Sequence, residues 1–344
     1  MKDTVPVLIV TLNRYEHFER CLRSLEKNSL AKDTEIFIGI DYPFKEEHWD
    51  GYRKICNLLE RNTFDFKKVT VLKHKKNVGV EKNHYLTRDL LYKKYDSYIF
   101  SEDDNEFSSD YLEYMNKVMS KYRNDENILA VSGYSYPVNT EGLENGVLFS
   151  LDTYFSAFGY GIWKQKDELM CKTINMSTFM TYYSDRRKMK ELRRRSTNQY
   201  CNFVKGMVEY IPELIKNGEV KKIDLSYGLY MFFNHKKMIF PLVSKVRNTG
   251  YDGSGENCGE MTGKNGTRYR NYDFSSQPID KKNHFELPET VNSVSCNNLT
   301  DEKLNDFFKV GWAEKVKTVF VYYLSLIIGR KNTAYLIHVI KREK

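Results

Sequence analysis

Four acidic side chains follow directly on an apolar stretch in the first half of the chain. The segment YIFSE (98–102) has the composition of a buried strand, and the acids are Glu102, Asp103, Asp104 and Glu106. Mutual repulsion makes such a cluster costly unless a positive group lies beside it. Hard cations such as Mg²⁺ and Mn²⁺ take carboxylate oxygens as ligands, often together with substrate phosphates. The pattern therefore predicts a metal site, and the plainer alternative is a solvated loop or an acidic helix start.

The elements that would position these acids alternate between strand and helix over the first 135 residues. Continuous apolar runs predict strands at residues 6–11, 35–41, 68–74, 98–102 and 128–133. Apolar residues at helical spacing predict helices over 18–25, 80–95 and 111–122, the last one capped by Ser108 or Ser109. Apolar strands in regular alternation with helices indicate an α/β fold with a mostly parallel sheet that is covered on both faces.

Ligands of a parallel sheet bind beyond the carboxyl ends of its strands. The turn L-N-R (12–14) follows the first expected strand, Asp41 ends the second, and the segment KNVGVEKN (76–83) follows the third. The acidic cluster follows the fourth. Because these ends meet at one edge of the sheet, we expect Arg14, Asp41 and Lys82 to share a cleft with the acids.

Several motifs of other enzyme classes do not occur. No G-x-G-x-x-G follows the first strand and there is no G-x-x-x-x-G-K-[ST], so neither a dinucleotide fold nor a P-loop is indicated. A serine nucleophile of the G-x-S-x-G type is also missing. The seven histidines have no H-x-x-x-H spacing, and the six cysteines have no C-x-x-C spacing.

The composition is that of a globular protein. Of the 344 residues 41% are hydrophobic, 29% charged and 14% aromatic, which argues against disorder and fits one large α/β domain with an appendage, or two domains. The net charge is +8, and part of it is concentrated in the run DRRKMKELRRR (185–195). A solvated helix face is the plain interpretation of that run, while nucleic acid and anionic lipid are the partners it would suit.

Three segments, in this order, resemble a known family: VPVLIVTLNRYEHFERCLRSL, EIFIGID and SEDDNEFSSDYLEYM. They are similar to the nucleotide-sugar domain of inverting GT-A glycosyltransferases, of the N-acetylglucosaminyltransferase I type and of the family 2-like bacterial capsule and lipopolysaccharide type. SEDDNE stands in the place of the family's metal-binding D-x-D. The resemblance covers residues 5–135 and, more loosely, 220–260. It implies a Rossmann-like GT-A fold, Mn²⁺ or Mg²⁺, a nucleotide-diphospho-sugar donor, expected to be a UDP-sugar, and a glycan acceptor on a lipid carrier.

The resemblance also implies roles for single residues. Asp104 would ligate the metal, with Glu102 and Asp103 on the ribose or sugar side. Arg14 would contact the diphosphate and Asp41 the pyrimidine ring, although a surface arginine and a turn aspartate are equally good interpretations of these two residues. The remaining candidates for the donor pocket are Thr11, Asn13, Asn77 and Lys82.

An inverting transferase needs a base for the acceptor proton. Asp224, in KKIDLSYGLYMFF, resembles the acid that precedes a helix in this family, and we expect the helix to begin after it. A helix N-cap is the structural alternative for this residue. Asp252 and Glu256 are the runners-up, because the Gly- and Asn-rich segment 248–266 suits a loop that closes over a site.

We expect a nucleotide-sugar-binding half at 1–135, an acceptor-binding half at 136–310 and an amphipathic helical segment at 311–344. That last segment carries a predicted apolar stripe made of Val316, Val319, Phe320, Tyr323, Leu324, Ile327 and Ile328. With cations around it, the stripe suits a helix on an anionic membrane surface, and packing on the protein's own core or on a second subunit suits it equally. The sequence predicts a cytoplasmic protein that is peripheral on the inner face of the cytoplasmic membrane, and it leaves the oligomeric state open.

Two other functions compete with the transferase. A sugar nucleotidyltransferase would use the same sheet and acids, but it would need a Gly-rich phosphate loop near the N-terminus, which this sequence lacks. A nucleic-acid-binding protein would suit the positive charge, but the basic residues lie away from the acidic edge and no nucleic-acid motif occurs. We therefore expect no nucleic-acid partner.

Overall fold

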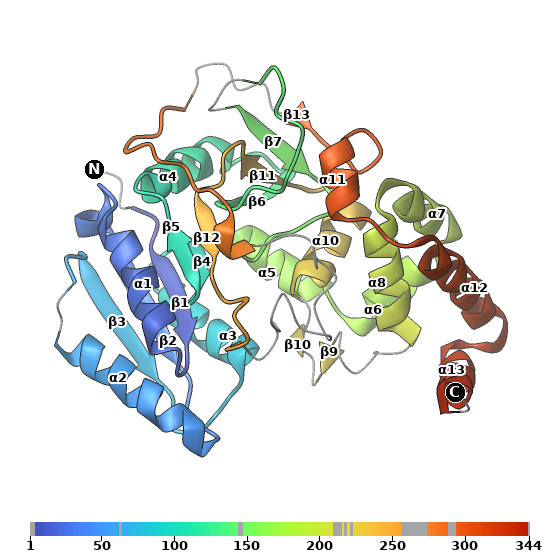
Figure 1. The fold of residues 1–344 in the computed structure, drawn as a ribbon, viewed down its shortest axis with the longest axis horizontal. Helices are drawn as coiled ribbons and strands as arrows, with labels where there is room; N and C mark the ends of the chain where they lie inside the picture. Colours follow the sequence, from blue (N-terminus) through green and yellow to red (C-terminus); the bar gives the residue numbers. More distant parts are fainter. Residues whose placement is uncertain are drawn as a thin grey trace.

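The computed structural model describes residues 4–61, 64–143, 147–208, 215–216, 219–220, 223–255, 274–287 and 294–342. Across these ranges, a nine-stranded sheet forms the middle of the molecule (Figure 1). From one edge to the other its strands are β13 (Val294–Ser295), β7 (Leu148–Leu151), β11 (Lys237–Pro241), β6 (Ile128–Ser132), β8 (Tyr160–Trp163), β4 (Ser97–Glu102), β1 (Val7–Thr11), β2 (Glu35–Ile40) and β3 (Lys68–Lys73).

The half of the sheet formed by β4, β1, β2 and β3 is parallel throughout. All five residues of β1 are buried, because alternate side chains enter two different cores. Val7 and Ile9 pack with helices α1 (Tyr15–Glu26), α2 (Trp49–Glu60) and α4 (Tyr111–Tyr122) on one face. Leu8 and Val10 belong to the core on the other face, which also includes residues of α3 (Val80–Leu91). The sheet is thus covered on both faces, as the continuous apolar strands predict.

The other half of the sheet is mixed. Strand β8 lies between β4 and β6 and is antiparallel to both, and β7 is antiparallel to β11. The expected strand at 128–133 therefore does not pair with the strand at 98–102. Gly161 of β8 packs against Met115 and Met119 of α4, so closely that a β-carbon there would lie 2.3 Å from the Met119 sulfur. Strand β8 cannot be recognised from the sequence, because this region has an irregular pattern of Tyr, Phe and Gly.

A second, short antiparallel ribbon pairs β5 (Asn105–Phe107) with β12 (Val246–Asn248). Because β5 begins directly after Asp104 and includes Glu106, this ribbon brings residues 246–250 against the acids. Strands β9 (Ile215–Lys216) and β10 (Glu219–Val220) form another small antiparallel pair.

Helices dominate the second half of the chain (Figure 1). They are α5 (Lys164–Thr173), α6 (Met176–Ser184), α7 (Arg186–Arg195), α8 (Thr197–Val208), α10 (Ile223–Phe233), α11 (Glu302–Phe307), α12 (Trp312–Ile328) and α13 (Arg330–Arg342). Single 3₁₀ turns lie at η1 (Ala31–Asp33), η2 (Glu46–His48) and η3 (Phe274–Ser276). Gly329, with φ of 84°, separates α12 from α13, so the C-terminal segment is two helices. No helix in the described ranges is both long and apolar enough to cross a bilayer.

The expected α/β fold with a mostly parallel central sheet and a C-terminal helical appendage is confirmed. Three helix boundaries differ from the prediction. Helix α3 ends at Leu91 and not at residue 95, and the N-cap of α4 is Asp110 and not a serine. Helix α10 begins at Ile223, which places Asp224 inside its first turn.

Candidate active site

A pocket of about 230 Å³ opens at the carboxyl ends of β1, β2 and β4. Seven of the residues that the sequence assigns to donor binding line it, together with the expected metal ligand Asp104; the seven are Thr11, Asn13, Arg14, Asp41, Asn77, Glu102 and Asp103. Phe44, Gly79, Asn83, Ser254 and Gly255 are among the other lining residues. Three strand ends and the segment after β12 therefore meet at one edge, where the parallel arrangement places ligands.

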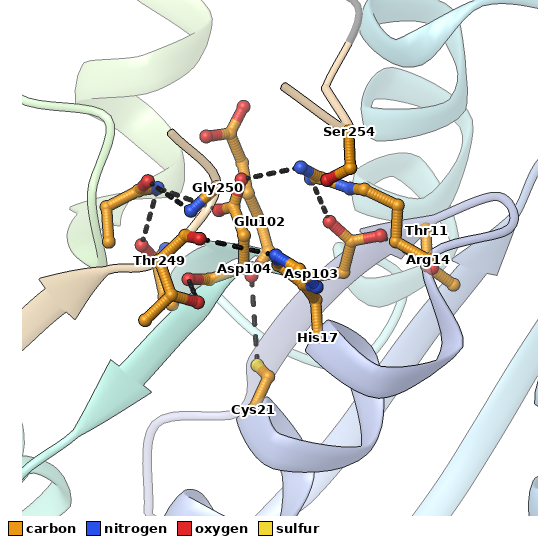
Figure 2. Close-up of polar contacts among 12 residues, drawn as sticks. Thr11, Arg14, His17, Cys21, Glu102, Asp103, Asp104, Thr249, Gly250 and Ser254 are labelled. Carbon is orange, nitrogen blue, oxygen red and sulfur yellow. Dashed lines mark hydrogen bonds and ion pairs between the residues drawn. The ribbon is translucent and has the colours of Figure 1, made fainter. Parts of the chain in front are cut away.

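The positive group beside the acids is Arg14 (Figure 2). Its Nη1 lies 2.9 Å from Oδ2 of Asp104, and its Nη2 forms an ion pair with Oδ1 of Asp103. The other oxygen of Asp103 accepts a hydrogen bond of 2.8 Å from the Thr11 hydroxyl. Burial opposes the charge on Arg14, but attraction to the two carboxylates outweighs it and raises the pKa of the guanidinium. The repulsion within the cluster is thus offset by a side chain of the protein itself.

The segment after β12 holds Asp104 in place. Asn248 donates a hydrogen bond of 2.7 Å from Nδ2 to Oδ1 of Asp104, and the backbone N–H of Thr249 donates one of 2.8 Å to the Asp104 carbonyl. Gly250 packs so closely that a β-carbon would lie 2.0 Å from Oδ2 of Asp104. Burial raises the pKa of the Asp104 carboxyl, while Arg14 acts in the opposite direction. Sequence reasoning missed these contacts, since they join residues far apart in the chain.

Glu102 is the acid with the most available carboxyl group. It lines the pocket, and no hydrogen bond to its side-chain oxygens is found in the described part of the chain. Burial raises the pKa of Glu102 to about 8, and the negative charges of Asp104 and Asp224 add to the rise.

Asp41 also lines the pocket, and its carboxylate binds the loop before α3. Its Oδ1 accepts hydrogen bonds from the backbone N–H groups of Tyr42 and Val78, at 2.8 and 2.9 Å. Its Oδ2 accepts from the N–H of Gly79 at 2.8 Å and from Nδ2 of Asn77 at 3.1 Å. Both oxygens are therefore occupied by the loop that leads into α3, where Gly79 has a φ of 84°.

Lys82 does not share this cleft. It lies on the exposed side of α3 and is not among the residues that line the pocket. Asn83, one residue further along, is turned inward and donates a hydrogen bond of 2.9 Å to the carbonyl of Gly39. One residue rotates a helix by about 100°, so Asn83 and Lys82 cannot both face the sheet.

Asp224 accepts a hydrogen bond of 3.0 Å from the backbone N–H of Ala157, through Oδ1. Its contact is with a distant loop and not with its own helix, so capping does not describe this side chain. The residue is open to solvent, yet the protein gathered around its carboxyl is dense enough that desolvation raises the pKa to about 6. The expected base is thus a carboxyl group with a raised pKa that is not among the residues lining the pocket.

Asp252, the first runner-up, has a different environment. Its Oδ1 accepts from the N–H and the hydroxyl of Ser254, at 3.0 and 2.6 Å, and its Oδ2 lies 3.1 Å from Nε2 of His17. Desolvation opposes these interactions, but the Ser254 hydrogen bonds and His17 prevail and lower the pKa of Asp252. Asp252 closes a turn at the surface. Glu256, the second runner-up, lies outside the described residues, as does most of the segment 248–266.

Comparisons with known proteins give little to identify the chain. No protein-family model matches it, and no curated protein does. Solved structures with some similarity include TarS from S. aureus, with a TM-score of 0.30 and 15% identity over 42% of this chain and 24% of that one. Another is the mannosyltransferase PcManGT from Pyrobaculum calidifontis, in complex with GDP-Man and Mn²⁺, with a TM-score of 0.34 and 15% identity over 48% and 46% of the two chains.

A structure of TarS 1–349 gives a TM-score of 0.31 and 16% identity, over 42% of this chain and 39% of that chain. The chain thus spans less than half the length of each of these structures. Similarity of this size assigns no activity to the chain.

The acidic cluster suits a hard divalent cation in its chemistry, because it offers carboxylate oxygens at a ligand-binding edge. Its geometry in this structure is that of a site closed by an arginine. Each oxygen of Asp103 and Asp104 contacts Arg14, Thr11 or Asn248. In the described ranges no three His, Cys, Asp or Glu side chains are arranged as a ready metal site. A metal ion would therefore have to take the place of Arg14, and a diphosphate would offer Arg14 a new anionic partner.

Proposed function

We propose that this chain is a metal-dependent, inverting glycosyltransferase of the GT-A type, which moves a sugar from a nucleotide diphosphate to a hydroxyl group. The observation that supports this most is the convergence of Arg14 with Asp103 and Asp104 at the carboxyl ends of the parallel strands. Arg14 and the aspartates suit a diphosphate and its metal. Asp224, whose pKa is raised, suits removal of the acceptor proton. A UDP-sugar, carrying a hexosyl or N-acetylhexosaminyl group, is the proposed donor.

On the donor side, Arg14 would turn from the acids to the diphosphate, and Asp104 would hold the cation. Bound Mn²⁺ or Mg²⁺ would supply positive charge to the phosphate oxygens of the leaving nucleotide. Thr11 and Asn248 keep the two aspartates in place while their arginine partner changes. Preorganised charges of this kind stabilise the negative charge that develops as the glycosidic bond breaks.

On the acceptor side, Asp224 would take the proton of the attacking hydroxyl. The acceptor oxygen forms a bond to the anomeric carbon while the bond from that carbon to the diphosphate oxygen breaks, and the electron pair leaves with the nucleotide. The proton ends on the Asp224 carboxylate. A pKa of about 6 leaves this group ionised at neutral pH and still basic enough to accept a proton. The hydrogen bond from Ala157 fixes the orientation of the carboxyl.

The remaining parts of the proposal concern the chain as a whole. Residues 1–135 would bind the donor and residues 136–310 the acceptor, which we propose to be a lipid-linked bacterial surface glycan such as a capsule or lipopolysaccharide precursor. This acceptor would place the enzyme at the inner face of the cytoplasmic membrane.

A panel of nucleotide-sugars, incubated with the protein and Mn²⁺ or Mg²⁺, tests the proposal through metal-dependent release of the nucleoside diphosphate. We expect release from one or a few UDP-sugars, and its loss in Asp104→Asn. A sugar nucleotidyltransferase would instead release pyrophosphate from a nucleoside triphosphate and a sugar phosphate. That product, or a complete lack of turnover with every nucleotide-sugar, would contradict the proposal.

A further inference from the structure

Helix α12 carries large apolar side chains that face solvent. Trp312 and Ile327 are both 79% exposed and Phe320 is 65% exposed, with Val316 and Tyr323 also exposed between them. We call these five residues the α12 stripe. In Figure 1, α12 and α13 lie at the opposite end of the molecule from β1, β2 and β3. The α12 stripe therefore has no part in the pocket described above.

The opposite side of α12 is the one that packs on the protein. Thr318, Val321, Tyr322 and Ser325 are buried there. The Tyr322 hydroxyl donates a hydrogen bond of 3.1 Å to the Tyr183 carbonyl, and the hydroxyls of Tyr183 and Ser325 lie 2.7 Å apart. The α12 stripe thus lies on the side of the helix that faces away from the protein core. Of the predicted apolar stripe, Val316, Phe320, Tyr323 and Ile327 are exposed, while Val319, Leu324 and Ile328 are half-buried.

The positions of the five residues form a continuous band. At 100° per residue, they fall within about 80° of one another around the helix axis. Lys315 and Lys317 lie about 60° beyond the two edges of this band, one on each side. Lysines in that position can extend their ammonium groups to phosphates while the apolar band enters the acyl region.

The segment around the stripe has a net positive charge. Residues 309–342 contain seven cations, Lys309, Lys315, Lys317, Arg330, Lys331, Lys341 and Arg342, and one acid, Glu314. The local charge is therefore +6 in a chain whose net charge is +8. Glu314 itself forms an ion pair with Lys205 of α8 at 2.5 Å. An isologous contact between two copies would bring together two faces of the same positive charge, whereas an anionic surface would attract this face.

We propose that the α12 stripe docks on the surface of an anionic lipid bilayer, with the helix lying in the plane of the interface and the flanking lysines at the phosphates. The exposed tryptophan, the apolar band and the excess of cations are the features of an interfacial helix. This inference rests on the C-terminal helices alone, and it stands or falls independently of the proposed activity.

Trp312 provides the direct test. The chain has three tryptophans, and the other two, Trp49 and Trp163, are half-buried and buried. We expect the fluorescence emission of the full-length protein to shift to shorter wavelength with vesicles of 70% phosphatidylcholine and 30% phosphatidylglycerol. The shift should be absent in Trp312→Phe, and pure phosphatidylcholine should give little of it. An emission spectrum that stays unchanged with the anionic vesicles would overturn the proposal.

Flotation with the same vesicles tests the stripe and its flanks separately. Phe320→Gln/Ile327→Gln should lower the partition coefficient by about tenfold or more, because two apolar side chains no longer enter the interface. Lys315→Gln/Lys317→Gln should lower it by about 30-fold, at roughly fivefold for each lysine. The matched control is Leu86→Gln/Leu169→Gln, which removes exposed leucines from α3 and α5 and should float like the wild type.

Because the altered side chains are exposed, the variants are expected to fold, and circular dichroism of each checks this. Equal flotation of the α12 variants and the control would overturn the proposal. So would variants that float normally but lose a concentration-dependent dimer in sedimentation, because the stripe would then be a contact between two copies of the chain.

Discussion

At the scale of single residues, Arg14 determines the state of the candidate site. Its guanidinium lies between Asp103 and Asp104, at the position that we propose for the cation. A guanidinium that is buried beside two carboxylates forms strong charge-assisted hydrogen bonds with them. A bound diphosphate would compete with the two carboxylates for the Arg14 guanidinium. Binding of metal and binding of nucleotide should therefore be coupled through this one side chain.

Arg14→Gln tests that coupling. Without the competing charge, the affinity for Mn²⁺ in the absence of nucleotide should rise by about tenfold, because the two carboxylates lose their internal partner. The affinity for UDP in the presence of Mn²⁺ should fall by about tenfold, the scale of one charge-assisted hydrogen bond. Calorimetry measures both quantities, with Arg20→Gln on the exposed side of α1 as the control. Mn²⁺ affinity that does not change in Arg14→Gln would show that the arginine does not compete for the site.

Asp224→Asn separates chemistry from donor binding. The amide oxygen of Asn can still accept the hydrogen bond from Ala157, but it cannot take a proton, so transfer should fall by about 10² or more while UDP binding is unchanged. In the wild type, the rate should rise with pH to a plateau, with a midpoint near the Asp224 pKa of about 6, because the base acts only when ionised. Full activity in Asp224→Asn would move the search for the base to Asp252 and Glu256.

The stability of the same variant gives a second check. Desolvation raises the Asp224 pKa above that of the unfolded chain, so ionisation of Asp224 costs folding free energy as the pH rises through this range. Asp224→Asn should therefore be as stable as the wild type, or more stable, at pH 7. A large loss of stability in urea unfolding would indicate a structural role for the carboxylate and would weaken its assignment as the base.

At the scale of elements, the β5–β12 ribbon presents Asp104 to the pocket. Gly250 lies directly after this ribbon and against the Asp104 carboxylate. In Gly250→Ala the new methyl group would have to displace that carboxylate, because the β-carbon would lie 2.0 Å from Oδ2. We expect metal-dependent UDP binding to weaken by about tenfold, since small displacements at a site of this kind are costly. Gly311→Ala, where no atom lies within 4 Å of the added β-carbon, is the control and should bind UDP normally.

A buried ion cluster ties this ribbon to the rest of the fold. Lys245, just before β12, forms ion pairs with Asp110 at the start of α4 and, at 2.7 Å, with Asp280. Lys245→Met leaves two carboxylates without their cation and should lower the free energy of unfolding by about 3 kcal/mol or more, measured in urea at pH 7. Burial opposes ionisation of Asp280, but Lys245 prevails and lowers its pKa. Its contribution is thus present at neutral pH and is lost as the pH falls through that lowered pKa. A loss of stability that is independent of pH between 7 and 3 would contradict this account.

The elements also show what the sequence could and could not predict. Five strands and the edge where Arg14, Asp41 and the acids meet follow from local patterns, because apolar strands and the polar residues after them are short-range features. The insertion of β8 between β4 and β6 depends on long-range pairing with no local signal. The contacts of Asn248 and Gly250 with Asp104 also depend on long-range pairing, in this case between β5 and β12. The sequence assigns Lys82 to the donor pocket, whereas the structure has it on the exposed side of α3. Basic character alone does not say which side of a helix faces a pocket.

At the scale of the whole molecule, the two sites to which we assign functions are separated in space. The pocket lies at the carboxyl ends of β1, β2 and β4. Helix α12 lies at the opposite end of the molecule from β1, β2 and β3 (Figure 1). Between them, α8 packs against both α10, which bears Asp224, and α12. An enzyme attached through α12 would keep its donor pocket away from the contact surface. This arrangement suits a soluble donor and an acceptor carried on lipid.

The central claim is that Asp104 holds a divalent cation that joins the nucleotide to the protein. Calorimetric titration of UDP into the protein, with Mn²⁺ and with a chelator, tests it most directly. The account predicts binding that requires Mn²⁺ in the wild type and in Glu106→Gln, whose carboxylate pairs with Arg247 at 2.6 Å and does not line the pocket. In Asp104→Asn that binding should weaken by about tenfold or more, the cost of losing a charged ligand. UDP affinity that is the same with chelator, or the same in Asp104→Asn as in Glu106→Gln, would contradict the claim.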